Sequence, residues 1–585
     1  MTGQEAVSPA EQAATQALGK VFKAIDEGKS FRLEAGAGAG KTYTLVKALR
    51  HLIDTRGAAF HNKNQSIACI TYTNVAKEEI KARTDNHPVV LAETIHAFSW
   101  SVIRDFQKVL RSRIPELSDK WRARIDEVGG VGCRTVTYTL GYPKVTDSEI
   151  FLHHDDVIKL MVYLLHDHKF KLILASRFPI ILIDEYQDTN KYLAEAFKTQ
   201  FIETGQGPLI GLFGDHWQKI YGSASCGLVS SSVGALEVIG KNANFRSDRL
   251  IVESLNKIRP DLVQHVSDPN SEGEVQVFHS NSWAGSRQTG AHWAGDLPPA
   301  DAHQFLESLK AHLSENGWHF SQGKTKILML TNNVLAAEQG YSQLASVFGD
   351  PDDYLKKGND YIAFLVDTVE LGCSYFERGE FGEMFRAFNL TPRIRNHAEK
   401  ADWNRDLRSL LALKETGTIG DVIDLLKNTQ KPRLPAKLEQ KERKLSQIID
   451  TPVEDRSEDD IKLLERTETL KAVPYRELNA LSKYIDDKTI FSTKHGVKGA
   501  EFENVVIVCG RGWNQYNWNQ MLEWENSGIP AGKEETFERS RNLFYVACSR
   551  PKKRLTILFT QELSNDALTS LSKWFGSENV HALHV

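Results

Sequence analysis

Apolar runs alternate with helix-forming segments over the first hundred residues of the chain, and the alternation resumes after residue 171. Residues 43–49 and 75–83 are expected to be helices. The predicted strands of this part are residues 66–71, 91–93, 178–183 and 208–213. Continuous apolar runs such as 178–183 are typical of parallel strands that helices cover on both faces. This pattern predicts an α/β core.

The second half of the chain repeats the alternation around a long helical segment. The predicted strands are residues 274–278, 326–330, 489–492, 505–509 and 554–559. Residues 281–299 are rich in glycine, proline and serine, which predicts a loop. Residues 345–480 are helical in pattern and rich in charge, as residues 100–165 are in the first half.

These patterns predict two α/β cores, each interrupted by a helical accessory insertion. The first core comprises residues 1–99 and 166–244, with its insertion at 100–165. The second comprises residues 245–344 and 481–585, with its insertion at 345–480. A chain of 585 residues is expected to form several domains rather than one.

Composition is that of a globular protein in a reducing compartment. Hydrophobic residues make up 41% and charged residues 25%, and the net charge is −4, so any nucleic-acid surface must be a local groove. The six cysteines are scattered without a CxxC pair, which argues against a zinc site or a disulfide framework. No apolar run approaches the roughly twenty residues of a membrane span, so a cytoplasmic protein without a membrane partner is expected.

A phosphate-binding loop precedes the helix at residues 43–49. Its small residues let backbone N–H groups surround phosphates, Lys41 would reach the β- and γ-phosphates, and the Thr42 hydroxyl would hold Mg²⁺. The first position of the usual pattern is glycine, whereas this chain has alanine. The predicted nucleotide contacts are Ala35, Gly36, Ala37, Gly38, Ala39, Gly40, Lys41, Thr42 and Tyr43. A flexible glycine–alanine loop is the alternative, and the Gly-Lys-Thr sequence disfavours it.

Two carboxylates follow the apolar run at residues 178–183. Asp184 would hold Mg²⁺, directly or through water, and Glu185 is placed to polarise the water that attacks the γ-phosphate. The alternative is an acidic helix start after a strand. The phosphate-binding loop upstream favours the catalytic interpretation.

Several further motifs occur in order from Gln12 to Arg550. They are Ser8-Pro9-Ala10-Glu11-Gln12, Tyr72-Thr73-Asn74, Thr94-Ile95-His96, Asp184-Glu185-Tyr186-Gln187-Asp188-Thr189-Asn190, Gly214-Asp215-His216-Trp217-Gln218-Lys219-Ile220-Tyr221, Asn244-Phe245-Arg246-Ser247, residues 493–502 and residues 541–550. Together they resemble superfamily 1 helicases of the UvrD/Rep/PcrA type. The resemblance implies two RecA-like P-loop cores that hydrolyse ATP with Mg²⁺ and bind DNA.

The resemblance also implies roles for individual residues in the nucleotide site. Gln12 would read the adenine edge, although Gln16 is a competitor and an ordinary helix start is the alternative. Phe245 would stack on adenine, and Glu501 would contact the ribose. The implied catalytic groups are Lys41, Asp184, Glu185, the γ-phosphate sensor Gln218, and the phosphate-neutralising Arg246 and Arg550.

A second set of motif residues is implied to bind single-stranded DNA. Aromatic rings stack on bases, while hydroxyl, amide and imidazole groups suit phosphates. The set comprises Tyr72, Thr73, Asn74, Thr94, His96, Tyr221, Thr493 and His495. Outside this context, His96 would be interpreted as a hydrogen-bonded core histidine. The family usually carries an aromatic residue shortly after the position of Tyr221, and here Ser223 stands in its place, which would weaken translocation or rearrange base contacts.

Two weaker clusters leave alternatives open. Residues 153–156 and 166–168 are rich in histidine and aspartate, and a polar helix face is favoured over a metal site. The basic residues between 431 and 444 could track duplex phosphates or form a solvated helix face.

The expected function is an ATP-dependent single-stranded DNA translocase and helicase, with 3′→5′ polarity implied by the resemblance. The alternative is a DNA-sensing ATPase subunit of a larger assembly with little unwinding of its own. Shortened helicases of this family occur beside nucleases in bacterial anti-phage systems such as Gabija, so a nuclease subunit is a possible partner beside single-stranded or tailed duplex DNA. A P-loop protein without turnover is disfavoured, because Lys41, Glu185, Gln218 and Arg550 are all present.

Overall fold

The computed structural model describes residues 7–139, 143–220, 222, 224–231, 233–290, 293–321, 323–329, 332–391, 394, 396–486, 489–493, 500–510 and 516–585. The chain divides into two compact units. The first comprises Met1–Gln276, Gln520–Leu555 and Ser564–Val580. The second comprises Val277–Asn519, Thr556–Leu563 and His581–Val585.

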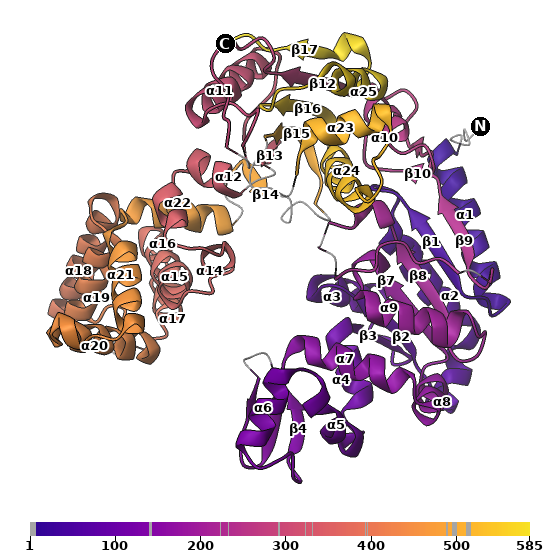
Figure 1. Ribbon diagram of the computed structural model, residues 1–585, viewed down its shortest axis with the longest axis horizontal. Coiled ribbons are helices and arrows are strands. Elements are labelled where there is room, and N and C mark those ends of the chain that lie inside the picture. The colour runs from indigo at the N-terminus through magenta and orange to yellow at the C-terminus, as the bar shows by residue number, and fades with distance from the viewer. Residues whose placement is uncertain are drawn as a thin grey trace. The chain divides into compact units, whose positions relative to one another are not determined.

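A six-stranded parallel sheet forms the centre of the first unit (Figure 1). Its spatial order is β3 (Val90–Thr94), β2 (Ile67–Thr71), β7 (Ile180–Asp184), β8 (Leu209–Gly214), β1 (Phe31–Ala35) and β9 (Glu237–Lys241). The helices of this core are α1 (Pro9–Asp26), α2 (Lys41–Asn62), α3 (Asn74–Arg83), α4 (Ile95–Ile103), α7 (His154–Leu165), α8 (His168–Arg177) and α9 (Lys191–Phe197). The order of strands in space differs from that in sequence because helical crossovers join parallel strands.

Both faces of this sheet are buried. Ile180 and Leu182 of β7 pack in a core with α1 and α2, while the alternate residues Ile181 and Ile183 pack in a second core with α4 and α7. Successive side chains of a strand point to opposite faces, so a strand covered on both sides must be apolar throughout. This explains the uninterrupted apolar run from which the strand was predicted.

The insertion within the first unit combines helices with a small sheet. It holds α5 (Gln107–Arg113), α6 (Asp119–Glu127), β4 (Thr135–Tyr138), β5 (Lys144–Val145) and β6 (Glu149–Leu152). The three strands pair in the order β4-β6-β5, a sheet that the sequence pattern did not predict. The strands are too short to give a clear alternation of polar and apolar residues.

A second six-stranded sheet lies in the C-terminal half. Its order is β14 (Phe491–Thr493), β13 (Thr325–Met329), β15 (Phe502–Cys509), β16 (Pro551–Phe559), β12 (Glu274–His279) and β17 (Val580–Ala582), and β13 pairs in parallel with both β14 and β15. The helices of this half of the chain that lie outside its helical insertion are α11 (Pro299–Glu315), α12 (Asn332–Gln339), α23 (Trp518–Ser527), α24 (Glu534–Cys548) and α25 (Asn565–Phe575). The predicted fold class of two α/β cores with parallel sheets is confirmed.

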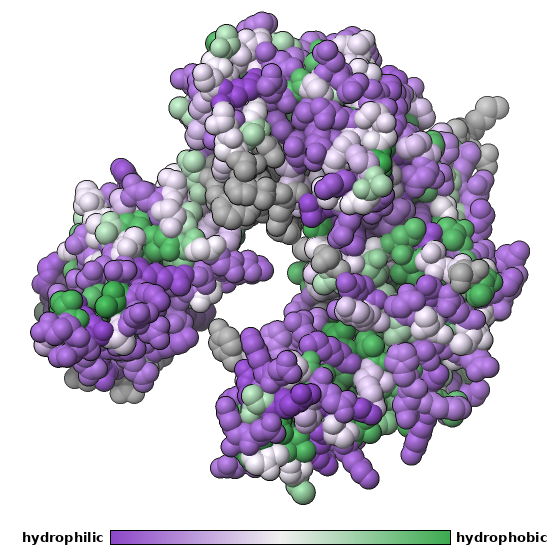
Figure 2. Space-filling model, viewed as in Figure 1, coloured by the Kyte–Doolittle hydropathy of each residue, from purple (hydrophilic) through white to green (hydrophobic). Residues whose placement is uncertain are grey.

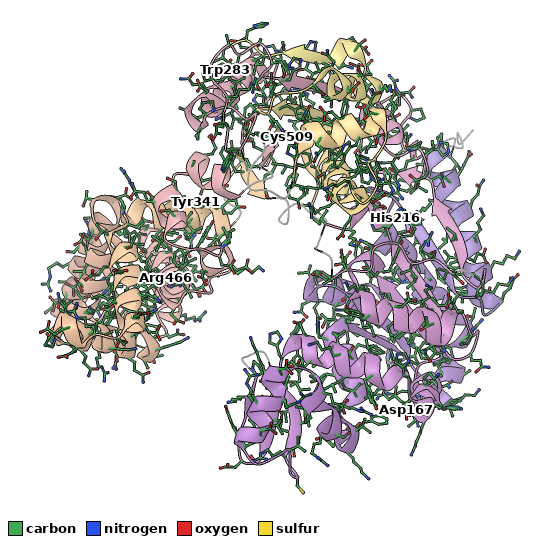
Figure 3. The ribbon with its side chains drawn as sticks, viewed as in Figure 1. Asp167, His216, Trp283, Tyr341, Arg466 and Cys509 are labelled. Atoms are coloured by element: carbon green, nitrogen blue, oxygen red, sulfur yellow. The ribbon has the colours of Figure 1, made fainter. Side chains whose placement is uncertain are left out.

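The helical insertion of the second unit has its own hydrophobic core. Its helices are α13 (Ser342–Ser346), α14 (Asp352–Leu355), α15 (Asp360–Phe364), α16 (Leu371–Glu377), α17 (Phe381–Ala387), α18 (His397–Thr416), α19 (Ile419–Thr429), α20 (Ala436–Asp450), α21 (Glu458–Ala472) and α22 (Tyr475–Ile485). Its outer surface is mainly hydrophilic in the view of Figure 2. Figure 3 shows Tyr341 at the start of this region and Arg466 on α21.

None of the described helices is both long enough and apolar enough to cross a membrane. All six cysteines are free thiols.

Candidate nucleotide and DNA site

The predicted site residues of the first unit gather at one edge of its sheet. Because the strands are parallel, their carboxyl ends share an edge, where α/β proteins bind ligands. The predicted phosphate-binding loop follows β1, Asp184 ends β7 and Asp215 follows β8. At the neighbouring strands, Tyr72 follows β2 and Thr94 ends β3.

The phosphate-binding loop is held by the segment that follows β9. Asn244 Nδ2 donates to the carbonyl of Ala37 at 3.2 Å, and the Phe245 N–H donates to the carbonyl of Gly38 at 2.9 Å. A Cβ atom on Gly38 would lie 2.7 Å from Asn244 Oδ1, and the φ of this residue is +73°. Only glycine allows both the left-handed backbone and this close approach. Gly40, with φ +72°, then leads into α2.

The charged side chains of the two motifs meet at the loop. Lys41 Nζ lies 3.9 Å from Glu185 Oε1 and donates to the carbonyl of Ala35 at 3.5 Å. Asp184 is buried, and burial, followed by the charge of Glu185, raises its pKa to about 7, while Lys41 opposes the shift. The buried carboxylate of Asp184 is a suitable ligand for Mg²⁺. Thr42 is the second residue of α2, so its hydroxyl lies at the start of the helix that follows the loop. The residues therefore fit Mg²⁺ and a polyphosphate.

Glu185 lies in a strained backbone conformation. Its φ is +48°, in the left-handed region that residues other than glycine seldom adopt. Gln187 Nε2 donates to Glu185 Oε2 at 2.5 Å, and Gln187 Oε1 accepts from the Asp215 N–H at 3.0 Å. Gln187 thus connects the predicted water-activating carboxylate to the motif that follows β8.

Asp215 is fully buried and accepts several hydrogen bonds. Arg259 Nη1 donates to Oδ1 at 2.6 Å, and Gln218 Nε2 donates to Oδ2 at 2.8 Å. The Trp217 N–H also donates to Oδ1, at 3.1 Å. The predicted γ-phosphate sensor Gln218 is therefore oriented by a carboxylate that a buried arginine neutralises.

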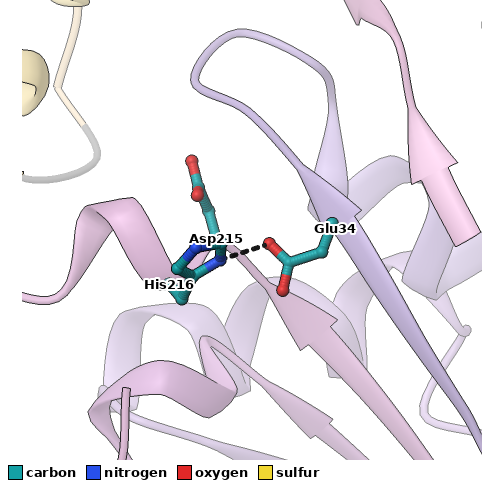
Figure 4. A group of neighbouring side chains, drawn as sticks. All are labelled: Glu34, Asp215 and His216. Carbon is teal, nitrogen blue, oxygen red and sulfur yellow. Dashed lines mark hydrogen bonds and ion pairs between the residues drawn. The ribbon is translucent and has the colours of Figure 1, made fainter. Parts of the chain in front are cut away.

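Glu34 lies beside Asp215 and His216 (Figure 4), and their potential ligand atoms lie within 4.8 Å of one another. Glu34 pairs with Arg32 at 3.0 Å, His216 Nδ1 at 3.1 Å and Arg259 Nη2 at 3.6 Å, and it accepts from the Tyr186 hydroxyl. Burial raises the pKa of Glu34, but His216, the Tyr186 hydroxyl and the charge of Arg32 together outweigh burial and hold the pKa below its usual value. Protein donors satisfy this cluster, so it is a hydrogen-bonded network rather than a metal centre.

The two arginines predicted to neutralise phosphate lie in the same unit as Lys41. Arg246 Nη1 donates to the carbonyl of Ser549 at 2.9 Å, and Arg550 Nε donates to the carbonyl of Val546 at 2.8 Å. Arg550 is 1% exposed. Burial, followed by the charge of Arg246, lowers the pKa of Arg550 to about 9, and the charge of Glu185 opposes this shift. Arg246, Arg550 and Glu185 are therefore close enough to influence one another.

Helix α24, which precedes Arg550, packs on the turn after Asp215. The Arg541 guanidinium lies 3.7 Å from the centre of the Trp217 ring, and Tyr545 meets the same ring edge-on at 5.5 Å. Asn542 Nδ2 donates to the carbonyl of His216 at 3.2 Å. The last motif of the chain thus contacts the motif that holds Gln218.

The first DNA-binding candidates lie side by side on neighbouring strands. Thr71 pairs in register with Thr94, so β2 and β3 end at the same level of the sheet, and residues 72–74 and 95–96 follow these two strand ends. Tyr72 is 45% exposed, and Thr73 and Asn74 are exposed as well. Thr73 also caps α3 by accepting from the Ala76 N–H at 3.2 Å. An exposed ring beside exposed polar groups suits a single strand.

His96 is held by a stack of rings. The centre of its ring lies 3.4 Å from the centre of the stacked His154 ring. The His154 Nδ1 in turn shares a hydrogen bond with the Tyr138 hydroxyl. Burial, followed by the charge of His154, lowers the pKa of His96 to about 4. At neutral pH this side chain can therefore offer hydrogen bonds to a phosphate, but no positive charge.

Some of the remaining predicted DNA- and nucleotide-binding residues lie wholly or partly outside the described residues. Tyr221 and His495, and the position of Ser223, lie outside the described residues; Thr493 ends β14, but its side chain also lies outside them. Glu501 is exposed in the second unit. In the first unit, Phe245 is 44% exposed.

Gln12 lies in the first turn of α1. Its amide donates to the carbonyl of Val7 at 3.2 Å. Ser8 and Glu11 form a capping box at the same turn, so this segment is a regular helix start whether or not Gln12 also contacts a base.

The histidine- and aspartate-rich clusters are used in helix capping. His153 and Asp156 form the cap of α7, and Asp156 also accepts from Trp121 Nε1 at 2.8 Å. Asp167 caps α8 by accepting from the Phe170 N–H at 2.8 Å (Figure 3). These contacts favour the polar-face interpretation over a metal site.

The basic stretch of residues 431–444 is largely neutralised by nearby carboxylates. The ion pairs are Lys431–Asp406 at 2.6 Å, Arg433–Glu439 at 2.8 Å, Lys437–Asp360 at 2.8 Å, Arg443–Glu439 at 3.5 Å and Lys444–Asp460 at 3.1 Å. Lys441 lies over the Tyr361 ring, 4.9 Å from its centre. These internal pairs favour a structural helix face over a track for duplex phosphates.

Sequence reasoning missed three charged residues near the site. Glu34 could have been noticed, because a charged residue within a strand covered on both faces needs a buried partner. Lys241 ends an edge strand that was not predicted, and Arg259 follows α10 (Arg249–Ile258) without any motif. Nothing in the local pattern distinguishes these two from surface residues.

Two family models match the chain. Residues 20–224 match the AAA domain, and residues 305–562 match the UvrD-like helicase C-terminal domain. The two matched segments lie in the first and the second half of the chain.

Similar proteins fall into two groups by coverage. The chain is 24% identical to Gabija protein GajB of Bacillus cereus, over 96% of this chain and 97% of that protein. It is 25% identical to ATP-dependent DNA helicase Rep of Salmonella typhimurium, over 38% of this chain and 40% of that protein. It is 24% identical to ATP-dependent DNA helicase PcrA of Staphylococcus epidermidis, over 41% of this chain and 38% of that protein.

Proposed function

This chain belongs to the UvrD-like superfamily 1 helicases, and on that premise we propose that it is an ATP-dependent single-stranded DNA translocase and helicase with 3′→5′ polarity. The observation that carries the proposal is the approach of Lys41 to Glu185 at 3.9 Å, beside two arginines from distant parts of the chain. Such a gathering of charge suits the transfer of a phosphoryl group.

The residues divide the chemistry of ATP hydrolysis between them. Lys41 and the N–H groups of the loop bind the β- and γ-phosphates, and Glu185 accepts the proton of the attacking water. Arg246 and Arg550 stabilise the negative charge that develops on the γ-phosphoryl group. Thr42 and Asp184 would hold Mg²⁺, which neutralises phosphate charge when it is bound.

The coupling to DNA runs through the network around Asp215 in this proposal. Gln187 connects Glu185 to Asp215, and Asp215 in turn holds Gln218, which precedes the DNA-binding candidate Tyr221 by three residues. A change at the γ-phosphate can therefore be transmitted to the strand-contacting segment through hydrogen bonds that differ between two states.

A second candidate function is a DNA-sensing ATPase subunit of a larger, anti-phage assembly that includes a nuclease. The observation in its favour is coverage, because similarity to the Gabija protein GajB extends over 96% of the chain whereas that to Rep extends over 38%. Under this candidate, ATP turnover would license a partner, and strand separation by the isolated chain would be weak.

Two assays test the proposal and separate it from its rival. Single-stranded DNA should stimulate ATP hydrolysis under both candidates. A forked duplex with a 3′ tail should be separated by the helicase, whereas ATP hydrolysis without separation supports the sensor. Absence of any DNA-stimulated hydrolysis would reject both.

Glu185→Gln tests the assignment of the water-activating group. We expect this variant to bind ATP normally and to lose turnover by about 10²–10⁴-fold, the usual effect of removing a general base. Glu253→Gln is a matched control, since Glu253 forms an exposed pair with Arg249 on α10. Hydrolysis at the parent rate by the Glu185 variant would show that another group activates the water.

A further inference from the structure

A second lysine lies buried beneath the phosphate-binding loop. Lys241 ends β9 and is 1% exposed. Its ammonium group donates to the carbonyl of Gly40 at 2.9 Å and to Thr44 Oγ1 at 2.8 Å. Both acceptors are neutral, and in the part of the chain that the structure describes no carboxylate lies within 4.0 Å of the ammonium.

Apart from the Phe245 ring, whose centre lies 6.0 Å from the ammonium, the surroundings of Lys241 are unfavourable for a cation. Burial, followed by the charge of Lys41, lowers its pKa to about 8. Its two acceptors belong to the start of α2, where the partial charge of a helix is positive. A buried cation normally has an anionic partner. The protein places this one directly under a loop whose sequence and backbone suit an anion.

The hydrogen bond to Gly40 has a geometric consequence. In a trans peptide the C=O and the following N–H point in opposite directions. When Lys241 holds the carbonyl of Gly40, the N–H of Lys41 must therefore point away from Lys241. In a phosphate-binding loop, the N–H groups of this segment are the donors that surround the phosphates.

We propose that Lys241 is a positioning residue of the phosphate site, which fixes the Gly40–Lys41 peptide with its N–H toward a bound polyphosphate and supplies a positive charge that the polyphosphate compensates. The inference rests on the proposed function, since it takes the loop to be the nucleotide site. The ligand class is the polyphosphate chain of ATP or ADP, or inorganic pyrophosphate. Lys241 does not touch the reacting atoms.

Replacement by methionine separates this role from a structural one. Lys241→Met keeps the length of the side chain and removes its charge. The carbonyl of Gly40 retains a partner, because it also accepts from the Thr44 N–H at 3.2 Å. We therefore expect the ligand-free variant to unfold at the same temperature as the parent or higher, and its dissociation constants for MgATP and for magnesium pyrophosphate to rise by about tenfold, equivalent to about 1.4 kcal/mol. KM should rise similarly, with kcat within threefold, since ground state and transition state lose the same interaction.

Lys63→Met is the matched control, because Lys63 is an exposed lysine at the other end of the same helix. The Lys63 variant loses the same single positive charge, at the far end of α2. It should change the affinity for MgATP or for magnesium pyrophosphate by no more than twofold. Binding would be measured by titration calorimetry of the full chain with each of the two probes.

Three results would overturn the inference. One is unchanged affinity of Lys241→Met for both probes. Another is a loss of affinity for MgATP without a loss of affinity for magnesium pyrophosphate, which would indicate a contact with the nucleoside rather than the phosphates. The third is a fall in the unfolding temperature of the ligand-free variant, which would indicate a lysine that merely holds the fold. If the parent chain itself binds neither probe, the proposed function fails instead.

Discussion

Removal of the buried side chain of Arg259 should be costly to the first unit. Arg259 is 1% exposed, and its guanidinium lies 2.6 Å from Asp215 and 3.6 Å from Glu34. Arg259→Met removes the charge with a side chain of similar length. The two carboxylates would then remain buried without the cation that they share.

The expected magnitude follows from what each carboxylate retains. Glu34 keeps its contacts with Arg32 and His216, but Asp215 keeps only neutral donors among those that the structure describes, the Gln218 amide and the Trp217 N–H. Breaking a buried ion pair by removing one partner costs about 3–5 kcal/mol. At about 2–4 °C for each kcal/mol, the usual shift for a large domain, this corresponds to a fall of roughly 6–20 °C in the unfolding midpoint.

A double-mutant cycle identifies the cause. Asp215→Asn keeps the shape of the side chain and removes the charge that Arg259 neutralises. We expect the double variant Arg259→Met/Asp215→Asn to recover about 2–3 kcal/mol relative to the sum of the single variants, because an amide needs no cation. The assay is thermal unfolding followed by differential scanning fluorimetry, with urea midpoints as a second measurement.

Arg259→Met should also impair ATP hydrolysis. Asp215 holds Gln187 through its N–H, and Gln187 holds Glu185, so displacement of Asp215 should lower kcat more than it raises KM. A difference of about 2 °C in the unfolding midpoint corresponds to about 1 kcal/mol of unfolding free energy. If the midpoint of Arg259→Met lies within about 2 °C of that of the parent, the network does not stabilise the unit and the reasoning is refuted.

Three further predictions address the loop, the DNA contacts and the titration of a histidine. Gly38→Ala should abolish measurable ATP binding, because its Cβ would lie 2.7 Å from an amide oxygen at a φ of +73°, whereas Gly19→Ala, with open space on α1, should stabilise the chain by about 0.5–1 kcal/mol. Tyr72→Ala should weaken single-stranded DNA binding by about 1–3 kcal/mol in a fluorescence anisotropy titration, whereas Tyr192→Ala, 64% exposed on α9, should not. His96 has a pKa of about 4 against the usual 6.5, so the unfolded chain binds more protons between these values; stability should fall as pH is lowered through this window, and His96→Gln should reduce that slope.

Each of these predictions has a clear contrary outcome. ATP binding at parent affinity by Gly38→Ala would mean that the loop tolerates a shift of its neighbouring segment. Equal loss of DNA affinity in the two tyrosine variants would remove the case for a stacking role at Tyr72. An unchanged dependence of the unfolding midpoint on pH in His96→Gln would show that other groups account for acid sensitivity.

The sequence by itself determined the fold class and the position of the glycine-rich loop that is predicted to bind phosphate. The strands covered on both faces, such as β7, must be apolar throughout, so they were visible as uninterrupted runs. Gly38 and Gly40 adopt backbone conformations open mainly to glycine, so the loop was visible as a spacing of glycines. Asp184 follows its strand directly, and its place at the carboxyl edge is a consequence of parallel pairing.

Only the tertiary structure determined which charges meet. Arg259 neutralises Asp215 across 44 positions, and Lys241 lies under Gly40 across 201, separations over which no local periodicity operates. The same holds for the ring of His154 on His96, and for the pairing of Lys437 with Asp360. Burial patterns repeat along the chain and can be read locally, whereas the partner of a buried charge depends on how distant segments pack, which is why these contacts appeared only in the folded chain.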